Sequence, residues 1–199
     1  MIAIKKEDIE TFILNYEGDK DVTNIHSHIM GIYLDITNVE EYVLLTLIKD
    51  IIHKNSISRV PKNIGCISVE SPVRRQKGQI LTIEYLQELY DFAKENNIKL
   101  HLDAARLYMM TSASKIPIHE YTKYFDTVYC SLWKYFGAPW GAILAGDSKL
   151  ISNMFNTRRM FGGSIPNSSL NAALILSNLE GFEDKMNGEN SHSFWNSKA

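Results

Sequence analysis

Few cysteines, nearly balanced charge and the lack of long apolar runs set the first limits on this 199-residue chain. Two cysteines, Cys66 and Cys130, are too few for a disulfide framework, and reduced thiols are typical of cytoplasmic proteins. The 21 basic and 23 acidic residues give a net charge of −2, which does not favour nucleic-acid binding. No apolar run approaches the ~20 residues of a membrane-spanning helix, and the amino terminus, MIAIKKEDIETF, does not resemble a signal peptide. We therefore expect a cytoplasmic protein that binds neither membranes nor nucleic acid.

Strands alternate with helices along the chain, which is typical of an α/β layered domain. The strands are continuous apolar runs, which predicts a central, mostly parallel sheet covered by helices on both faces. The tail, residues 186–199, is rich in Asn and Ser and is expected to fray. The spacing predicts helices near 4–14, 39–53, 84–94, 117–124, 148–159 and 167–182, and strands at 64–69, 98–102, 127–132 and 141–146.

A carboxylate and a guanidinium follow the second predicted strand, in the sequence His-Leu-Asp-Ala-Ala-Arg-Leu. Asp103 stands where the strand ends, and ligands of open α/β sheets bind at the carboxyl ends of strands. Arg106 comes three residues later, so one turn of helix would direct both side chains into the same space. An aspartate that caps a helix beside an ion-paired arginine is the structural alternative, and it is favoured if this segment is taken alone.

A lysine follows the third predicted strand and stands among aromatic residues, in Ser-Leu-Trp-Lys-Tyr-Phe-Gly-Ala-Pro-Trp-Gly-Ala. Burial by these rings disfavours the ammonium form of Lys134 and lowers its pKa. A neutral amine is the nucleophile that forms a Schiff base with an aldehyde. A lysine that extends across an aromatic surface patch is an equally good interpretation of this segment alone.

The two segments together suggest one cofactor. Pyridoxal phosphate chemistry uses a lysine to hold the aldehyde and a carboxylate to keep the pyridine nitrogen protonated. Lys134 and Asp103 follow successive strands of the predicted sheet, so they can lie on either side of a single ring. The two residues together therefore support a pyridoxal phosphate site more strongly than either residue does alone.

Three motifs in series resemble the threonine aldolase and aromatic amino acid β-eliminating lyase family. They are the Asp103 segment, the Lys134 segment with its continuation Ile-Leu-Ala-Gly, and Arg-Arg-Met-Phe-Gly-Gly-Ser at 158–164. The resemblance spans about residues 64–185 and implies the fold of aspartate-aminotransferase-like pyridoxal phosphate enzymes. Residues 1–185 would then be part of the large cofactor-binding domain, with its glycine-rich phosphate loop and the small C-terminal domain expected to be absent.

The resemblance implies a role for each matching residue. Lys134 would hold pyridoxal 5'-phosphate as a Schiff base, and Asp103 would pair with the pyridine nitrogen. Arg106 would lie beside the phenolic oxygen or the substrate carboxylate, and Ser131 would contact the phosphate or orient the ring. Gly162 and Gly163 would shape a loop near the subunit interface, and the chain is expected to form a homo-oligomer.

The implied reaction is carbon–carbon cleavage of a β-hydroxy amino acid to glycine and an aldehyde, or β-elimination. Two departures bear on it. Ala104 replaces a glycine, and Val73 stands where many members carry a histidine that assists proton transfer in retro-aldol cleavage. The histidine's absence weakens the retro-aldol assignment. The expected lack of the phosphate loop and small domain leaves a truncated, inactive member as an alternative, and another reaction on the same scaffold, such as transamination or racemisation, is the third. The basic residues Arg74, Arg75 and Lys77 are interpreted as a solvated loop that faces the same sheet end.

Overall fold

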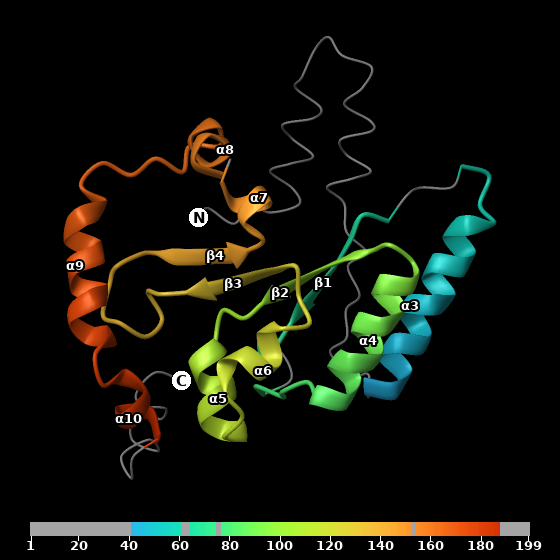
Figure 1. The fold of residues 1–199 in the computed structure, drawn as a ribbon, viewed down its shortest axis with the longest axis horizontal. Helices are drawn as coiled ribbons and strands as arrows, with labels where there is room; N and C mark the ends of the chain where they lie inside the picture. Colours follow the sequence, from blue (N-terminus) through green and yellow to red (C-terminus); the bar gives the residue numbers. More distant parts are fainter. Residues whose placement is uncertain (1–40, 61–63, 75–76, 153, 188–199) are drawn as a thin grey trace.

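The computed structural model describes residues 41–60, 64–74, 77–152 and 154–187 (Figure 1). The helix predicted at 4–14 lies outside these residues, as does the tail from residue 188 onward. Met186 and Asn187, which were predicted to begin the tail, belong to the last described helix, and Met186 is buried.

Helices and strands alternate, as the sequence predicts (Figure 1). The strands are β1 (Cys66–Glu70), β2 (Lys99–Asp103), β3 (Thr127–Ser131) and β4 (Ala142–Gly146). The helices are α3 (Glu41–Ser56), α4 (Ile83–Glu95), α5 (Leu107–Ser114), α6 (Ile118–Thr122), α7 (Ser148–Ile151), α8 (Met154–Met160), α9 (Ser168–Leu179) and α10 (Phe182–Asn187).

The four strands form one sheet in the order β1-β2-β3-β4. β1, β2 and β3 are parallel, and β4 pairs antiparallel with β3. The predicted α/β fold with a mostly parallel sheet is therefore confirmed. Because β1, β2 and β3 run in the same direction, their carboxyl ends meet at one edge, where Asp103 lies.

The main core lies between one face of the sheet and helices α3 to α6. Leu100 and Leu102 of β2 pack on this face, and α4 covers it with a buried stripe of Tyr85, Leu86 and Leu89. That helix begins where predicted, because the Thr82 hydroxyl accepts a hydrogen bond from the Tyr85 amide at 3.2 Å. Figure 1 shows α3 alongside α4.

The opposite face of β1 to β3 is polar, which differs from the predicted burial on both faces. Ser68 is exposed and His101 is half-buried, with its Nδ1 2.8 Å from the Thr127 hydroxyl. The strands therefore alternate between buried apolar and less buried polar side chains. Polar residues occur at every second position of these runs, which is the spacing expected of a sheet that packs against the core through one face only.

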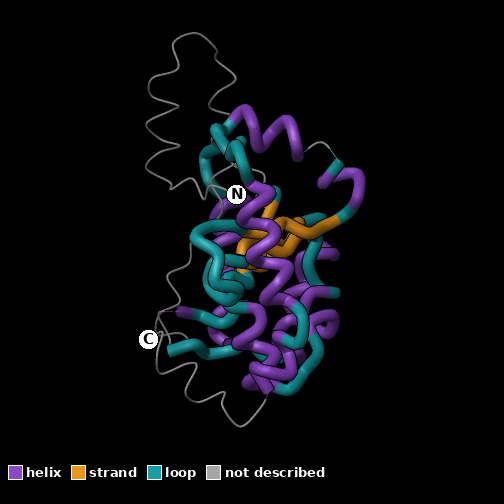
Figure 2. Tube along the Cα trace, turned by 90° about the vertical axis from the view of Figure 1, so that its left-hand side faces the viewer, coloured by secondary structure: helices purple, strands orange, loops and turns teal. Residues whose placement is uncertain are grey.

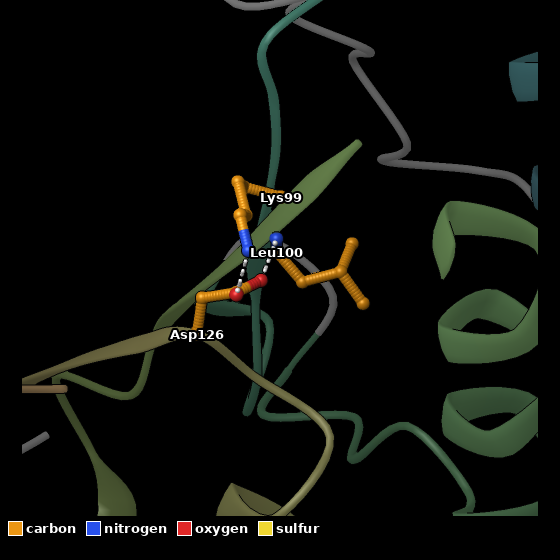
Figure 3. A network of polar contacts seen from close by, with 3 residues as sticks. All are labelled: Lys99, Leu100 and Asp126. Atoms are coloured by element: carbon orange, nitrogen blue, oxygen red, sulfur yellow. Dashed lines mark hydrogen bonds and ion pairs between the residues drawn. The ribbon is translucent and has the colours of Figure 1, made fainter. Parts of the chain in front are cut away.

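The amino-terminal end of β2 is fixed by Asp126, which precedes β3 (Figure 3). Its Oδ1 lies 2.8 Å from Lys99 Nζ, and its Oδ2 accepts the Leu100 amide at 2.9 Å. The Asp126 amide in turn donates to the Leu100 carbonyl at 2.9 Å. These contacts set the register of β2 and β3 at the edge opposite Asp103.

Two helical predictions are corrected, and one helix is added. The added helix, α5, lies outside the ranges that were predicted to be helical. The helix predicted at 148–159 is divided into α7 and α8, with Ser152 as the C-cap of α7. The helix predicted at 167–182 ends at Leu179, because Gly181 adopts a left-handed φ of 66° and α10 begins afresh.

An apolar surface remains uncovered on α8, α9 and β4. Figure 2 is viewed from the side of α9, which lies in front of the strands. Leu170 and Leu176 of α9 are 71% and 66% exposed, and Met160 of α8 is 80% exposed. Exposed apolar side chains are typical of an interface where they form a contiguous patch. No helix in the described part of the chain is long and apolar enough to cross a membrane.

Candidate active site

The carboxyl edge of the parallel strands brings charged side chains together. β1 ends at Glu70 and β2 at Asp103, and the two residues are directly opposite each other in the register. Tyr129 of β3 is the next residue in the same row. Because paired residues in a parallel sheet point to the same face, Glu70, Asp103 and Tyr129 form one polar row.

Asp103 is held by the turn that follows β2. Its Oδ1 accepts the Ala105 amide at 3.1 Å, which is a cap-like contact, although α5 takes Arg106 as its N-cap residue. The Ala104 amide donates to the Tyr129 carbonyl at 2.9 Å, so the turn is anchored to β3. No ion pair joins Asp103 to Arg106 among the described residues, which leaves both charges available to other partners.

Lys134 lies in a tight loop between β3 and β4. The Leu132 amide donates to the Gly141 carbonyl at 2.9 Å, and the Phe136 amide donates to the Leu132 carbonyl at 3.1 Å. Gly137 and Gly141 have φ values of 65° and 126°, which side-chain-bearing residues rarely adopt. The loop is therefore closed by its own backbone, and this fixes the position of the lysine.

Aromatic packing also anchors the loop that carries Lys134. Tyr135 and Phe136 are 5% and 0% exposed and form a second core cluster with Phe182 and Met186. The ring centroids of Phe136 and Phe182 are 4.7 Å apart. The Tyr135 hydroxyl donates to the Ala105 carbonyl at 3.2 Å. This bond ties the Lys134 loop to the turn that carries Asp103 and Arg106.

The charge of Lys134 is controlled by its surroundings. Burial is the main cause that lowers the pKa of its amine, and the Arg106 guanidinium lowers it further. Asp103 and Glu70 act in the opposite direction. The ammonium also lies 5.4 Å from the centroid of the exposed Trp133 ring. The lowered pKa agrees with the expectation from the aromatic sequence, and a lysine of this kind has an increased neutral, nucleophilic fraction.

Ser131, at the end of β3, is fully buried. Its hydroxyl has no hydrogen-bond partner of good geometry, although the serine is close enough to the Tyr129 phenol to lower its pKa. Burial and the Asp103 charge outweigh that effect, so the pKa of Tyr129 is raised. A buried hydroxyl without a well-formed bond is the kind of group that a bound ligand can satisfy.

The structure thus places Asp103, Arg106 and Lys134 at one edge, where the charges of Asp103 and Arg106 both shift the pKa of Lys134. Sequence reasoning did not identify Glu70 and Tyr129. Their signal was present, because each stands at or near the end of a strand, but the strand register was needed to align them with Asp103.

Metal and thiol chemistry find no support among the described residues. No group of three or more His, Cys, Asp or Glu side chains there could hold a metal ion. Burial raises the pKa of Cys130 to about 11, so its thiol is protonated at neutral pH, in agreement with a structural role.

Comparisons with known proteins show similarity over part of the chain. The chain is 38% identical over 110 residues to a low-specificity L-threonine aldolase from Candida albicans, covering 55% of this chain and 29% of that protein. It is 35% identical over 135 residues to an alanine racemase from Cochliobolus carbonum, covering 68% of this chain and 31% of the racemase. The chain thus spans about a third of the length of these curated relatives.

Solved structures share the fold. A protein from Listeria monocytogenes, assigned as an L-allo-threonine aldolase, aligns with a TM-score of 0.59 and 26% identity, over 77% of this chain and 46% of that one. The threonine aldolase of Leishmania major aligns with a TM-score of 0.53 and 19% identity, over 72% of this chain and 39% of that one, which shows a shared fold. The beta-eliminating lyase family model matches residues 18–196, which confirms the resemblance seen in the motifs, and the chain therefore belongs to the beta-eliminating lyase family.

Proposed function

We propose that this chain carries the lysine and aspartate of a pyridoxal-phosphate-dependent lyase. The reaction would cleave the Cα–Cβ bond of a β-hydroxy amino acid to give glycine and an aldehyde, or eliminate a β-substituent. The observation that carries the proposal is the common location of Lys134, Asp103 and Arg106 at the carboxyl edge of one sheet. The threonine aldolases among the relatives support the substrate class.

The residues present fit the cofactor. Lys134 has an amine whose pKa is lowered by burial, as covalent attachment to an aldehyde carbon requires. Asp103 has one carboxylate oxygen engaged by the Ala105 amide, and no other hydrogen bond to its carboxylate is found in the described part of the chain. Its other oxygen can therefore accept a pyridine N–H. The buried Ser131 hydroxyl, which has no well-formed hydrogen bond, would form one with the ring or the phosphate.

When bound, pyridoxal phosphate supplies an electron sink for the charge that develops at the substrate Cα. The chain's own residues would do the rest. Arg106 would bind an anionic oxygen, either the phenolic oxygen of the cofactor or the substrate carboxylate. Lys134 would carry a proton at its Nζ to and from the substrate Cα, and the buried ring of Phe136 would keep the lysine loop rigid while it does so.

The test is covalent trapping on the 199-residue chain. Incubation with pyridoxal phosphate followed by borohydride should place a stable label on Lys134, identified by peptide mass spectrometry. Lys134→Ala should lose the label, whereas Lys149→Ala, an exposed lysine of α7, should retain it. A label that persists in Lys134→Ala would refute the proposal.

Racemisation is the second candidate. The alanine racemase relative is 35% identical over 68% of this chain, and Val73, which is buried, replaces the histidine that many threonine aldolases use. Incubation with L-threonine, L-allo-threonine, phenylserine or L-alanine distinguishes the reactions. Glycine and an aldehyde would indicate carbon–carbon cleavage, D-alanine the racemase, and a 2-oxo acid with ammonia β-elimination. None of these products from a chain that takes up the label on Lys134 would indicate an inactive chain.

We also propose that the chain forms homo-oligomers in the cytoplasm. The exposed leucines of α9 support self-association, and Cys66 and Cys130 form no disulfide. Light scattering should show an oligomer that Leu170→Glu together with Leu176→Glu converts to a smaller species. A monomer in the unaltered chain would contradict self-association, and cell fractionation tests the compartment.

A further inference from the structure

Two asparagines of helix α9 bind the loop that carries Lys134. Among the residues of α9, all of which the structure describes, only Asn171 is buried, and its Nδ2 donates to the Trp140 carbonyl at 2.7 Å. Asn178 donates from its Nδ2 to the Phe136 carbonyl at 3.2 Å. Residues seven positions apart lie on the same face of a helix, so one face of α9 directs both amides at the loop, which lies beside it in Figure 1.

The two hydrogen bonds reach the backbone on both sides of Lys134. The Gly141 carbonyl, which follows the carbonyl that Asn171 binds, accepts the Leu132 amide at 2.9 Å. Phe136, whose carbonyl the second asparagine binds, donates its amide to the Leu132 carbonyl at 3.1 Å. The lysine therefore lies between two stretches of backbone that are both attached to α9.

Gly141 permits the close approach of α9 to this loop. It has a φ of 126°, and an added Cβ would lie 3.1 Å from Asn171 Nδ2 and 3.4 Å from Ile175 Cδ1. Ile175, which is half-buried, also packs against the second core cluster. The helix is thus seated directly on the backbone of the loop, and a side chain at position 141 would have to displace it.

The burial of Asn171 is explained by its hydrogen bond and not by packing. The Trp140 carbonyl can only accept a hydrogen bond, so the atom 2.7 Å from it is the amide nitrogen. The Oδ1 of Asn171 is buried without a hydrogen-bond partner in the described part of the chain, which is unfavourable. A leucine has a similar size, is common in the rest of α9 and would avoid this penalty. The donor to the loop is what distinguishes asparagine from leucine here.

We propose that Asn171 and Asn178 are positioning residues for Lys134, and that they act by attaching its loop to α9. The inference rests on the proposed function for its catalytic meaning. An amine that bonds to one aldehyde carbon and carries a proton to one substrate atom must be held in a single place. The loop's own hydrogen bonds close it, and the two asparagines fix the closed loop to the helix.

The first measurement is hydrogen exchange of the loop amides in the chain without cofactor, followed by mass spectrometry. Asn171→Leu keeps a similar size and removes one donor, and Asn178→Ala removes the other. Loss of one hydrogen bond of typical strength should make the amides of residues 132–136 exchange about fivefold faster. The amides of β2 should change less, because their hydrogen bonds to the neighbouring strands remain.

The second measurement is the concentration of pyridoxal phosphate that half-saturates the borohydride label on Lys134. The apparent affinity falls with the fraction of chains in which the loop is correctly placed, so this concentration should rise about threefold when Asn171→Leu and Asn178→Ala are combined. Asn178→Gln keeps an amide donor on an exposed side chain. It should therefore restore most of the affinity and loop protection that Asn178→Ala loses.

Asn96→Ala is the matched control. The Asn96 Nδ2 donates to the Phe92 carbonyl at 2.8 Å at the end of α4, so this variant removes a bond of the same kind near the amino-terminal end of β2. It should leave unchanged both the exchange of residues 132–136 relative to β2 and the half-saturating concentration. If Asn171→Leu does not fold, as judged by circular dichroism, Asn178→Ala and Asn178→Gln supply the test.

Loop exchange that stays unchanged in the folded α9 variants, or rises equally in Asn96→Ala, would overturn the inference. A half-saturating concentration that stays unchanged while loop exchange rises would also overturn it, because the asparagines would then support the fold and not the lysine. Failure of the proposed function gives a different result. A chain that takes no label on Lys134, with faster loop exchange confined to the α9 variants, would support the attachment of the loop and refute the cofactor.

Discussion

The hydrogen bond from the Tyr135 hydroxyl to the Ala105 carbonyl gives a sharp test of how the site is assembled. It spans 3.2 Å and joins the Lys134 loop to the turn after β2. Tyr135→Phe removes only the hydroxyl. The ring contacts should persist, with centroid distances of 5.4 Å to Tyr108 and 6.0 Å to Phe182. The substitution therefore separates the bond from the aromatic packing.

The expected cost follows from burial. Tyr135 and Ala105 are 5% and 7% exposed, so water cannot readily replace the lost donor. A typical hydrogen bond contributes about 1 kcal/mol net, and a buried carbonyl left unpaired adds a penalty, so we expect a loss of roughly 1–2 kcal/mol. With a urea dependence of about 2 kcal/mol per molar, the unfolding midpoint should fall by roughly 0.5–1 M.

The assay is urea unfolding followed by the fluorescence of the three tryptophans. Tyr90→Phe is the matched control, because no hydrogen bond of its hydroxyl is found in the described part of the chain, and its edge-to-face contact with Tyr124 would persist. Borohydride trapping on Lys134 should also slow in Tyr135→Phe, because the lysine loop is less firmly held. Equal midpoints for the two variants would refute the reasoning.

Two further predictions concern stability. The Asp126 pKa is lowered, because hydrogen bonds from Lys99 and the Leu100 amide outweigh the effect of burial. The stabilisation by ionised Asp126 is therefore complete above the ordinary carboxyl pKa of about 4 and is lost as the pH falls through the lower pKa of the folded state. In a plot of the urea unfolding midpoint against pH, Asp126→Asn should therefore show a smaller loss of stability at acid pH than the unaltered chain. An equally steep loss in both would contradict this. Gly163→Ala should lower stability by about 1–3 kcal/mol in thermal unfolding, because its Cβ would lie 2.8 Å from the Arg158 carbonyl oxygen. Gly65→Ala, with open space around it, should change stability by less than about 0.5 kcal/mol, and equal losses in both would show that the close approach is relaxed.

Local chemistry explains which elements could be predicted. The four strands are short apolar runs that end at polar residues, and α4 starts at a threonine cap and carries a buried stripe, so each is specified within a few residues. α5 was missed because its eight residues are too few for a helical periodicity to be evident in the sequence. The break between α9 and α10 depends on the left-handed φ of Gly181, which a sequence pattern does not reveal by itself.

The sequence alone determined the α/β class, the family motifs and the candidacy of Lys134, Asp103, Arg106 and Ser131, because residue type and position after a strand are local properties. Only the tertiary structure decided that Glu70 is opposite Asp103 and that Tyr135 binds the Ala105 carbonyl. Those relations depend on strand register and on contacts between residues 30 or more positions apart. They arise when the sheet pairs and the core packs, and no local pattern encodes them.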